Sequence, residues 1–557
     1  SGLVQLINIQ ESTMIWTIIV ASVVVLAIYH FTSKRYAYFE ERGIPYLKAF
    51  PFLGSLWKVV LMRASFAATV QQMYNLYSEA KYVGCFDFLT PVILLRDPEL
   101  IKSVMIKNFD HFPEHRNLSD NADDTLFSKN LFSLNGERWK EVRSMLSPAF
   151  TTSKMRSMFV LMKECAKRYG ENLVSLQADQ TILELKDTFT RYTNDVIATC
   201  AFGVSVDSMT YRENKFYLYG REASTFGLKQ SLKFFFIRSF PRLCRMLKIT
   251  LLRKGVSDFF KDLIESTIKT RDEQGIVRPD MLQLMMEFRD KGDPSKELTL
   301  DDMIAQAFVF FLAGFESTAT LMCFTTHEVG VNEEVQKRLQ DEIDQVLTDC
   351  NGNVTYEAIN GMKYLDAIVN EGLRKYPVSV TYEAINNMKY LDAIINESLR
   401  MYPVVVATDR ICMKDFELPP TLPSAKPYVV KKGEYIWIPV YGVQHDPDHF
   451  PEPDKFNPDR FLDDPKKIMN SGAFLSFGLG PRMCIGNRFA LLEAKTLLFH
   501  VFANCELKPC SKTTIPMKLS KQGFAMTADG GFWFDVQPRK KPQHVMVNSV
   551  SSNGVAF

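Results

Sequence analysis

The stretch AFLSFGLGPRMCIGNRFALLEAK, residues 473–495, carries the densest pattern in the chain. Five of its residues have the spacing F-x-x-G-x-R-x-C-x-G: Phe477, Gly480, Arg482, Cys484 and Gly486. A helix is predicted directly after them, so the thiol stands at a helix start, where free backbone N–H groups and the helix dipole favour a thiolate. Glycine lets the backbone pass close to a flat ligand. A thiolate held in this way suits a haem iron, because it pushes electron density toward bound oxygen.

The composition is that of a globular protein. The 557 residues are 46% hydrophobic and 23% charged, which allows one large core or several smaller ones. A net charge of +2 gives no general attraction to nucleic acid, so we expect no nucleic-acid partner. The ten cysteines lack paired spacing and are expected to be reduced in a cytoplasmic domain. A disulfide between Cys505 and Cys510 is conceivable, but their flanking residues do not support it.

The N-terminal part predicts a membrane anchor. Residues 14–31, MIWTIIVASVVVLAIYHF, are long and apolar enough for one spanning helix. A cleaved signal peptide or a buried helix would be the alternatives, but no basic residue precedes the run and no small-x-small site follows it. Lys34, Arg35 and Arg42 follow instead, which predicts a cytoplasmic location for the rest of the chain. Residues 1–13 precede the first methionine and are expected to be a non-native leader.

Residues 32–54 are expected to be a proline-containing linker, and residues 55–557 one catalytic domain with a disordered tail at 538–557. Helical periodicity dominates from about residue 70 to 340, while 82–97 and 434–443 alternate like strands. The pattern predicts a mainly α fold with a minor β portion. The aromatic and basic segment 229–252 fits either an amphipathic membrane-surface segment or a core helix pair joined at Pro241.

The chain contains one tandem repeat. Residues 354–379 recur with a few changes as 380–405, and each copy ends in Glu-x-x-Arg followed by Tyr-Pro. Glu and Arg at this spacing share one helix face and can form a bidentate pair. We expect the second pair, Glu397 and Arg400, to be the structural one, because it leads straight into the apolar residues 404–406. The first copy, with Glu371 and Arg374, is expected to form an extra surface helix.

Further motifs stand in a fixed order around these two regions. Residues 137–150 place Trp139 and Arg143 four apart on one helical face. In FFLAGFESTAT, residues 310–320, Ala313 and Gly314 leave room over a ligand. Glu316 and Thr318 there supply an acid and a hydroxyl, and a hydroxyl can compete for backbone bonds and open a helix locally.

Together these motifs resemble the cytochrome P-450 superfamily, over about residues 14–535. The resemblance implies the fold of that family, a large helical domain around haem with a small β-rich region. It also implies that Cys484 is the metal ligand of haem b, iron protoporphyrin IX, and that Glu316 and Thr318 relay protons. The other haem contacts that it implies are Arg482, Trp139, Arg143, Arg410, Phe477, Gly486 and Ala313. It further implies that Arg460, in FNPDRF, completes a structural triad with Glu397 and Arg400.

The function implied is that of a monooxygenase in the endoplasmic reticulum membrane with its catalytic domain in the cytoplasm. Electrons would come from NADPH through a reductase, with cytochrome b5 as a second donor, and the substrate would be a lipophilic small molecule. The wording of 315–329 and 441–461 is most similar to insect microsomal enzymes of xenobiotic metabolism. The alternatives are a haem-binding pseudoenzyme impaired by the duplication and a haem-thiolate isomerase or dehydratase.

Two other patterns were weighed. His445 and His449 have a metal-like spacing, but the proline-rich segment HDPDHFPEP cannot be helical, which disfavours a zinc site. The Gly478-x-Gly480 pair imitates a dinucleotide fingerprint, but Met483 stands where the third glycine belongs. Electrons are therefore expected from a separate protein.

Overall fold

The computed structural model describes residues 35–116, 124–177, 180–224, 240–278, 280–290, 298–352 and 380–539, with scattered positions within 16–32 and 230–237. The chain forms two compact units, each built from separate segments, where the sequence predicts one catalytic domain. Unit 1 comprises residues 1–116, 406–443 and 521–524. Unit 2 comprises residues 117–405, 444–520 and 525–557. The predicted leader, most of the predicted anchor, the first repeat copy and the tail from residue 540 lie outside the described residues.

Unit 1 contains the larger sheet. Its strand order is β1-β2-β7-β4, with β2 and β7 parallel and the other neighbours antiparallel. The strands are β1 (Tyr82–Asp87), β2 (Thr90–Leu95), β7 (Tyr435–Ile438) and β4 (Thr408–Ile411). The hairpin predicted at 82–97 is confirmed as β1 and β2. The strand predicted at 434–443 is shorter than expected, because residues from Val440 on form the helix α19 (Val440–Gln444).

The rest of unit 1 is a small hairpin and short helices. The hairpin pairs β5 (Phe416–Leu418) with β6 (Tyr428–Val430). The helices are α2 (Trp57–Val60), α3 (Phe66–Tyr74) and α4 (Pro98–Lys102). Helix α3 begins where the Ser65 hydroxyl accepts a hydrogen bond from the Ala68 amide at 3.1 Å, which satisfies one of the free N–H groups of the first turn.

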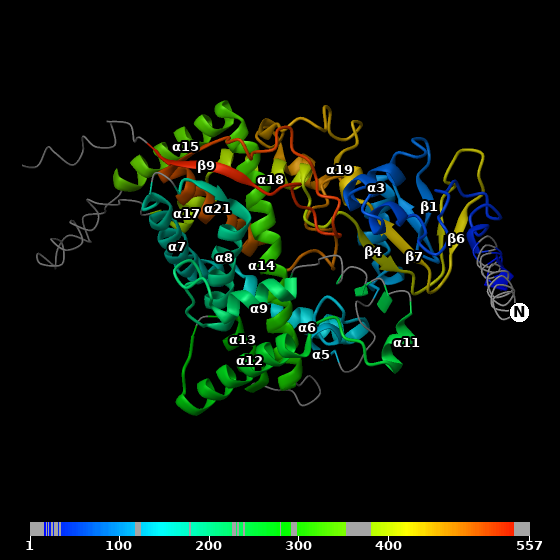
Figure 1. The fold of residues 1–557 in the computed structure, drawn as a ribbon, viewed down its shortest axis with the longest axis horizontal. Helices are drawn as coiled ribbons and strands as arrows, with labels where there is room; N and C mark the ends of the chain where they lie inside the picture. Colours follow the sequence, from blue (N-terminus) through cyan, green and yellow to red (C-terminus); the bar gives the residue numbers. More distant parts are fainter. Residues whose placement is uncertain are drawn as a thin grey trace, which may run out of the picture. The chain divides into compact units, whose positions relative to one another are not determined.

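Unit 2 is mainly helical, and its helices are labelled in Figure 1. They are α5 (Thr125–Ser128), α6 (Gly136–Leu146), α7 (Thr152–Val174), α8 (Leu185–Ile197), α9 (Lys215–Ser224), α11 (Pro241–Met246), α12 (Lys254–Gln274), α13 (Met281–Asp290), α14 (Leu300–Val331), α15 (Glu333–Gly352), α17 (Tyr382–Asn386), α18 (Lys389–Met401), α20 (Pro465–Asn470) and α21 (Asn487–Asn504). The one described sheet of the unit is small and antiparallel, in the order β3 (Ile182–Glu184), β9 (Trp533–Pro538), β8 (Cys505–Lys508). The predicted mainly α fold with a minor β portion is confirmed.

Helix α14 forms the core of unit 2. It begins with a capping box in which Thr299 and Asp302 each accept a hydrogen bond from the other's backbone N–H at 3.2 Å. Its apolar residues surround the axis, as expected of a buried helix, and it packs against α8, α21 and α18. Among the described residues, α14 alone is long and apolar enough to cross a membrane. Most of that apolar window is buried inside the protein, which identifies a core helix.

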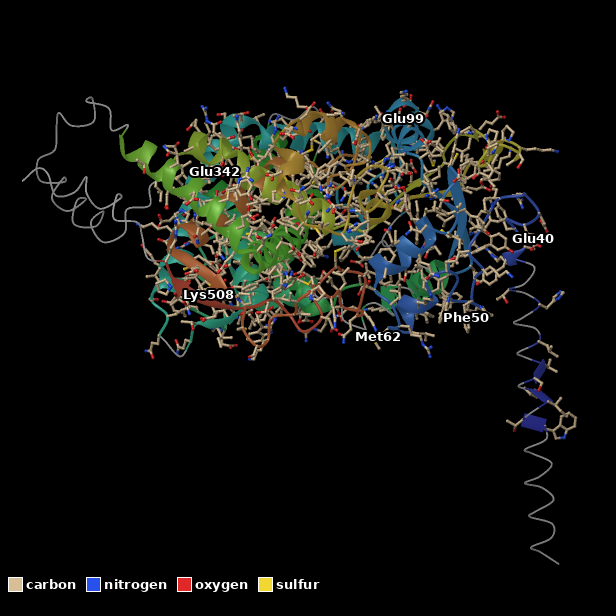
Figure 2. The ribbon with its side chains drawn as sticks, turned by 90° about the horizontal axis from the view of Figure 1, so that it is seen from above. Glu40, Phe50, Met62, Glu99, Glu342 and Lys508 are labelled. Carbon is tan, nitrogen blue, oxygen red and sulfur yellow. The ribbon has the colours of Figure 1, made fainter. Side chains whose placement is uncertain are left out.

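The second repeat copy forms α17 and α18. Thr381 caps α17 by accepting from the Ala384 amide at 3.1 Å. At the start of α18, the Glu342 carboxylate accepts from the amides of Tyr390 and Leu391 at 2.8 and 3.0 Å. Glu342 lies on α15 and is labelled in Figure 2. Contacts from another helix therefore fix the N-terminal end of α18.

Candidate active site

The Cys484 loop is shaped by two glycines and three backbone hydrogen bonds. Gly478 and Gly480 have φ values of 73° and 71°, which residues with a side chain rarely adopt. The Cys484 amide donates to the Phe477 carbonyl at 2.8 Å and closes the loop. The Gly478 amide donates to Leu475, and the Met483 amide to Gly480. Helix α21 then begins at Asn487, with Gly486 as its N-cap residue, so the thiol stands one turn before a helix as predicted.

The Cys484 side chain is exposed, whereas most described cysteines are buried. The surrounding protein raises the pKa of its thiol, and the backbone N–H of Gly486 and the Arg143 guanidinium oppose this rise. An exposed sulfur beside an N–H donor and a cation suits a metal that replaces the thiol proton. Cys505 and Cys510 are both free, so the disulfide weighed between them is absent.

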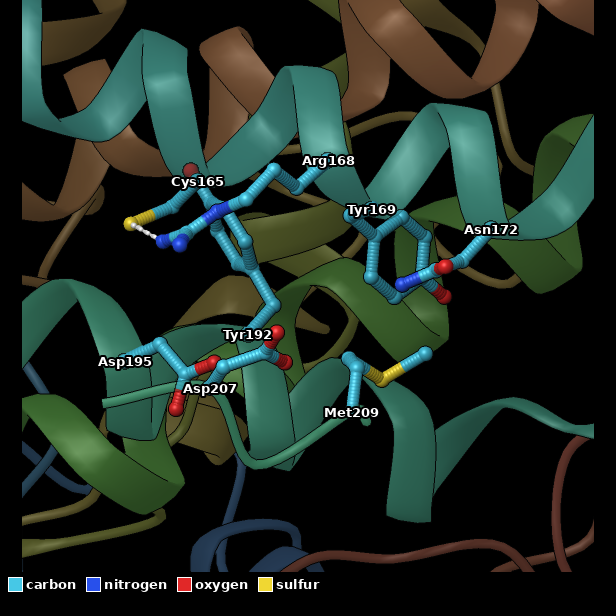
Figure 3. Close-up of a pocket in the computed structure, with 8 residues that line it drawn as sticks. All are labelled: Cys165, Arg168, Tyr169, Asn172, Tyr192, Asp195, Asp207 and Met209. Carbon is cyan, nitrogen blue, oxygen red and sulfur yellow. Dashed lines mark hydrogen bonds between the residues drawn. The ribbon is translucent and has the colours of Figure 1, made fainter. Parts of the chain in front are cut away.

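A second cysteine, Cys165, shows the opposite environment. It lines a small pocket in unit 2 with Arg168, Tyr169, Asn172, Tyr192, Asp195, Asp207 and Met209 (Figure 3). Burial raises the pKa of the Cys165 thiol to about 11, although Arg168 donates to its sulfur at 3.5 Å. Burial also raises the pKa of Asp195 to about 6. A thiol that stays protonated at neutral pH is a poor metal ligand, so this pocket is not the candidate site.

Three of the predicted haem contacts lie together beside the Cys484 loop. Trp139 and Arg143 come from α6, and Trp139 is 5% exposed. The Arg482 guanidinium lies over the Trp139 ring at 4.0 Å from its centroid and donates to the Leu134 carbonyl at 2.9 Å. Arg143 donates to the Met483 carbonyl at 2.9 Å. Two cations therefore flank the loop, an arrangement that fits an anionic ligand bound through the sulfur.

Arg410 belongs to unit 1 and is described there alone. It lies on β4, is 2% exposed, and its Nη1 donates to the Asp409 carbonyl at 2.7 Å and lies 3.2 Å from the His115 ring. Burial lowers the pKa of Arg410 to about 10. Its Nε has no hydrogen-bond partner among the described residues. A buried donor of this kind suits an anionic group.

Helix α14 presents Ala313 and Ser317 on one face and Thr318 on another. Ala313 is exposed although its neighbours Phe311 and Phe315 are fully buried. Ser317 follows one turn later on the same face and donates to the Ala313 carbonyl. Thr318 is 1% exposed and lies away from that face. The hydroxyl on the Ala313 side is therefore Ser317, which the sequence analysis missed although its spacing from Ala313 indicates it.

Glu316, the predicted acid, is paired with a lysine. Its carboxylate accepts from Lys186 Nζ at 2.7 Å, and the same ammonium donates to the Thr320 hydroxyl at 2.6 Å. Lys186 comes from α8, and the Thr193 hydroxyl on that helix donates to the Phe315 carbonyl at 2.7 Å. Helix α8 thus competes for a backbone acceptor of α14 in the turn that carries Glu316. No sequence pattern indicated Lys186.

Glu397, Arg400 and Arg460 meet in the interior. Glu397 accepts from Arg400 Nε and Nη2 at 2.7 and 2.9 Å, and from Arg460 Nε at 3.4 Å. The Asn457 amide also donates to Glu397 at 2.9 Å. Glu397 and Arg400 are 0% exposed, while the side chain of Arg460, in the short 3-10 helix η7 (Pro458–Phe461), is 11% exposed. The second repeat copy therefore provides the pair that meets Arg460.

Gln444 joins this triad to the Cys484 loop. Its side-chain amide donates to the carbonyls of Leu399 and Arg400 at 3.0 and 2.9 Å. Its side-chain carbonyl accepts from the Leu475 amide at 2.7 Å and from the Ser476 hydroxyl at 3.0 Å. Gln444 is fully buried, so these bonds form away from water. Helix α18 and the start of the 473–495 stretch are thus tied together by one side chain.

Comparison with known families gives one family model. The model described as Cytochrome P450 matches residues 44–381 and again 379–533. The match is interrupted where the first repeat copy ends, so both copies fall inside matched segments. The matched ranges include the 473–495 stretch, α14 and the triad.

Three curated insect proteins are similar along nearly their whole length. The chain is 42% identical to Cytochrome P450 9e2 of Blattella germanica, over 95% of this chain and 99% of that protein. It is 39% identical to Probable cytochrome P450 9f2 of Drosophila melanogaster, over 94% and 100%. It is 31% identical to Cytochrome P450 6k1 of Blattella germanica, over 92% and 95%.

Proposed function

The chain belongs to the cytochrome P450 family, and from this premise we propose that it is a membrane-bound haem-thiolate monooxygenase that inserts one oxygen atom of O2 into apolar small molecules. Members of the family are oxidoreductases that use haem b and receive electrons from NADPH through a reductase. The observation that carries the proposal is the Cys484 loop. It offers one exposed sulfur beside the Gly486 N–H and the Arg143 guanidinium, both of which favour the thiolate.

The residues near the loop have separate roles in this proposal. Cys484 holds the iron of haem b, which when bound supplies the centre where O2 is activated. Phe477 and Gly486 shape the loop against the ring. Positive charge for the propionates comes from Arg482 and Arg143, with Trp139 holding the Arg482 guanidinium flat. Arg410, in unit 1, stays predicted for the same role, which its unpartnered Nε supports.

Helix α14 handles protons in the proposal. Glu316 and Thr318 remain the predicted acid and hydroxyl, and we add Ser317 as the hydroxyl on the Ala313 face. Lys186 holds the Glu316 carboxylate in place, so Glu316 must leave that ammonium before it can carry a proton. Ala313 keeps the helix surface low where a substrate approaches.

The membrane proposal rests on exposed apolar side chains. Within 16–32, Trp16 and Leu26 are 64% and 65% exposed, which is unfavourable in water and expected in lipid. In unit 2, Phe240, Met246 and Leu247 at α11 are 46%, 73% and 55% exposed, which favours the membrane-surface interpretation of segment 229–252 over the core helix pair. Phe50 and Met62 of unit 1, labelled in Figure 2, are also exposed.

We place the enzyme in the endoplasmic reticulum membrane with its catalytic part in the cytoplasm. Its partners in this proposal are NADPH-cytochrome reductase, cytochrome b5 as a second donor, and lipophilic xenobiotic or endogenous substrates. Removing residues 14–31 should release the protein at least partly into a carbonate wash of the membranes. Wholly integral behaviour of the truncated chain would contradict the anchor assignment.

A reduced-CO difference spectrum of Cys484→Ser tests the proposed ligand. The variant should lose the thiolate-type band, because an alcohol is a far poorer ligand for this iron. Cys165→Ser is the matched control, since that thiol is buried and protonated, and it should keep the band. Retention of the band in Cys484→Ser would overturn the proposal.

The tandem repeat supports a second candidate, a haem-binding pseudoenzyme impaired by the duplication. NADPH consumption and product formation with added reductase separate the two. Turnover together with the thiolate-type band selects the monooxygenase. The band without turnover selects the pseudoenzyme.

A further inference from the structure

Glu493 is a buried acid that the proposed mechanism does not use. It lies on α21, the helix that follows the Cys484 loop, and is 0% exposed. Neither of its carboxyl oxygens has a hydrogen-bond partner among the described residues. An unpaired ionised carboxylate is costly in such a place, so the group is stabilised by taking up a proton.

Thr318 faces this acid from α14, which packs against α21. Its hydroxyl is buried and likewise has no partner among the described residues. The same helix carries Thr325 and Thr326, whose hydroxyls donate to the carbonyls of Leu321 and Met322. Thr318 differs from them because its hydroxyl oxygen remains available as an acceptor.

The surroundings of Glu493 favour its neutral form. Burial raises the pKa of Glu493 well above its usual value, and the nearby Thr318 hydroxyl opposes part of this rise. The titratable groups that sense the Glu493 charge are Tyr192 on α8 and Cys200 at 198–202. Burial raises the pKa of both, so both are neutral at physiological pH. The Tyr192 hydroxyl donates to the backbone carbonyl of Glu493 at 3.3 Å, not to its carboxyl group.

We propose that Glu493 is a positioning residue whose protonated carboxyl group donates a hydrogen bond to the Thr318 hydroxyl. This bond holds the α14 turn that carries Glu316 and Ser317 against α21. A protonated acid and a free hydroxyl acceptor satisfy each other, so the two orphaned groups explain one another. The importance of that turn for oxygen chemistry rests on the proposed function, whereas the bond itself does not.

Infrared spectroscopy of the full-length holoenzyme tests the bond directly. A protonated carboxyl stretch should be present in the wild type and absent from Glu493→Gln. Thr318→Val should shift that stretch to higher frequency, because the carboxyl loses its acceptor. Thr325→Val is the matched control and should leave it in place. Absence of a Glu493-dependent band, or a band that ignores Thr318→Val, would overturn the proposal.

The pH dependence of unfolding gives a second readout. The unfolded chain loses the Glu493 proton near its ordinary pKa of about 4.3, while the folded protein keeps it. The wild type should therefore lose stability relative to Glu493→Gln as pH rises. Between about pH 5 and 8, the ratio of their unfolding constants in urea should change roughly tenfold per pH unit. A constant ratio over this window would mean that Glu493 is ionised in the folded protein.

The positioning role is tested by the fraction of NADPH electrons that reach product. Glu493→Met and Thr318→Val should lower this fraction several-fold, while Glu493→Gln, whose amide can still donate to Thr318, should keep most of it. Equal coupling in all three variants would overturn the positioning role. Failure of the monooxygenase proposal would appear separately, as a wild-type enzyme without a thiolate-type CO band.

Discussion

Glu397 and Glu493 are both fully buried carboxyl groups in unit 2, yet their surroundings differ completely. Glu397 accepts from two arginines and one backbone amide. Neither oxygen of Glu493 has a partner among the described residues, and burial raises its pKa. Burial alone therefore does not decide whether an acid is charged. The partners decide it, because each ionic hydrogen bond offsets part of the desolvation cost.

The largest expected effect comes from making the Glu397 site unmatched. Glu397→Ala strands the buried Arg400 charge and should cost about 3–5 kcal/mol of stability, with loss of haem incorporation. Glu371→Ala, in the first repeat copy, is the matched control and should be nearly silent. Holoprotein yield from the CO spectrum and urea unfolding measure both. The reverse pattern would show that the first copy supplies the pair that meets Arg460.

A smaller loss is expected where the triad is tied to the Cys484 loop. Gln444→Leu leaves the Leu475 amide and two α18 carbonyls without their partner, which should cost about 3 kcal/mol. The surface change Gln537→Leu serves as control and should stay within about 0.5 kcal/mol. Urea unfolding measures both variants. Equal stability of the two would mean that the loop does not depend on Gln444.

Arg460 sharpens the comparison because it is the most exposed member of the triad. Arg460→Lys keeps the positive charge but loses the bond from Nη2 to the Glu452 carbonyl, which is 2.8 Å long. We expect a loss of about 1 kcal/mol, measured by urea unfolding. A loss as large as that of Glu397→Ala would show that charge alone does not match Glu397.

The smallest effect is expected at Asp392, an acid between the two extremes. It pairs with Lys495, but burial raises its pKa despite that cation. Its stabilising contribution is therefore present below its unfolded pKa of about 3.9 and is lost as pH rises. Asp392→Asn should change stability by less than about 1 kcal/mol at neutral pH, because the carboxyl is partly exposed. Relative to wild type, the variant should gain stability between pH 4 and 6, as urea unfolding would measure.

Local patterns predicted much of the fold and of the loop. The 82–97 hairpin, the helix after Cys484 and the burial of Glu397 with Arg400 follow from alternation, a glycine-bracketed cysteine and a helical pair. These signals lie within a few residues of one another along the chain. They are therefore visible without knowing what packs against them.

The partners that come from distant segments could not be predicted. Lys186, Gln444 and Glu493 act through residues far away in the chain, and nothing in their flanks marks them. The orientation of α14 about its axis was also open, since Ser317 and Thr318 are adjacent but about 100° apart around a helix. Only the burial of Thr318 and the exposure of Ala313 separate the two hydroxyls.

The Gln444 side chain has a consequence for how slowly the sulfur-bearing loop opens. The Leu475 amide donates to a residue that also holds two carbonyls of a fully buried helix, so it cannot open while α18 remains folded. In hydrogen–deuterium exchange, that amide should exchange at the rate of the α18 interior rather than at the rate of a surface loop. A loop without regular secondary structure thereby gains the kinetic protection of a core helix, and the escape of anything bound through Cys484 is slowed with it.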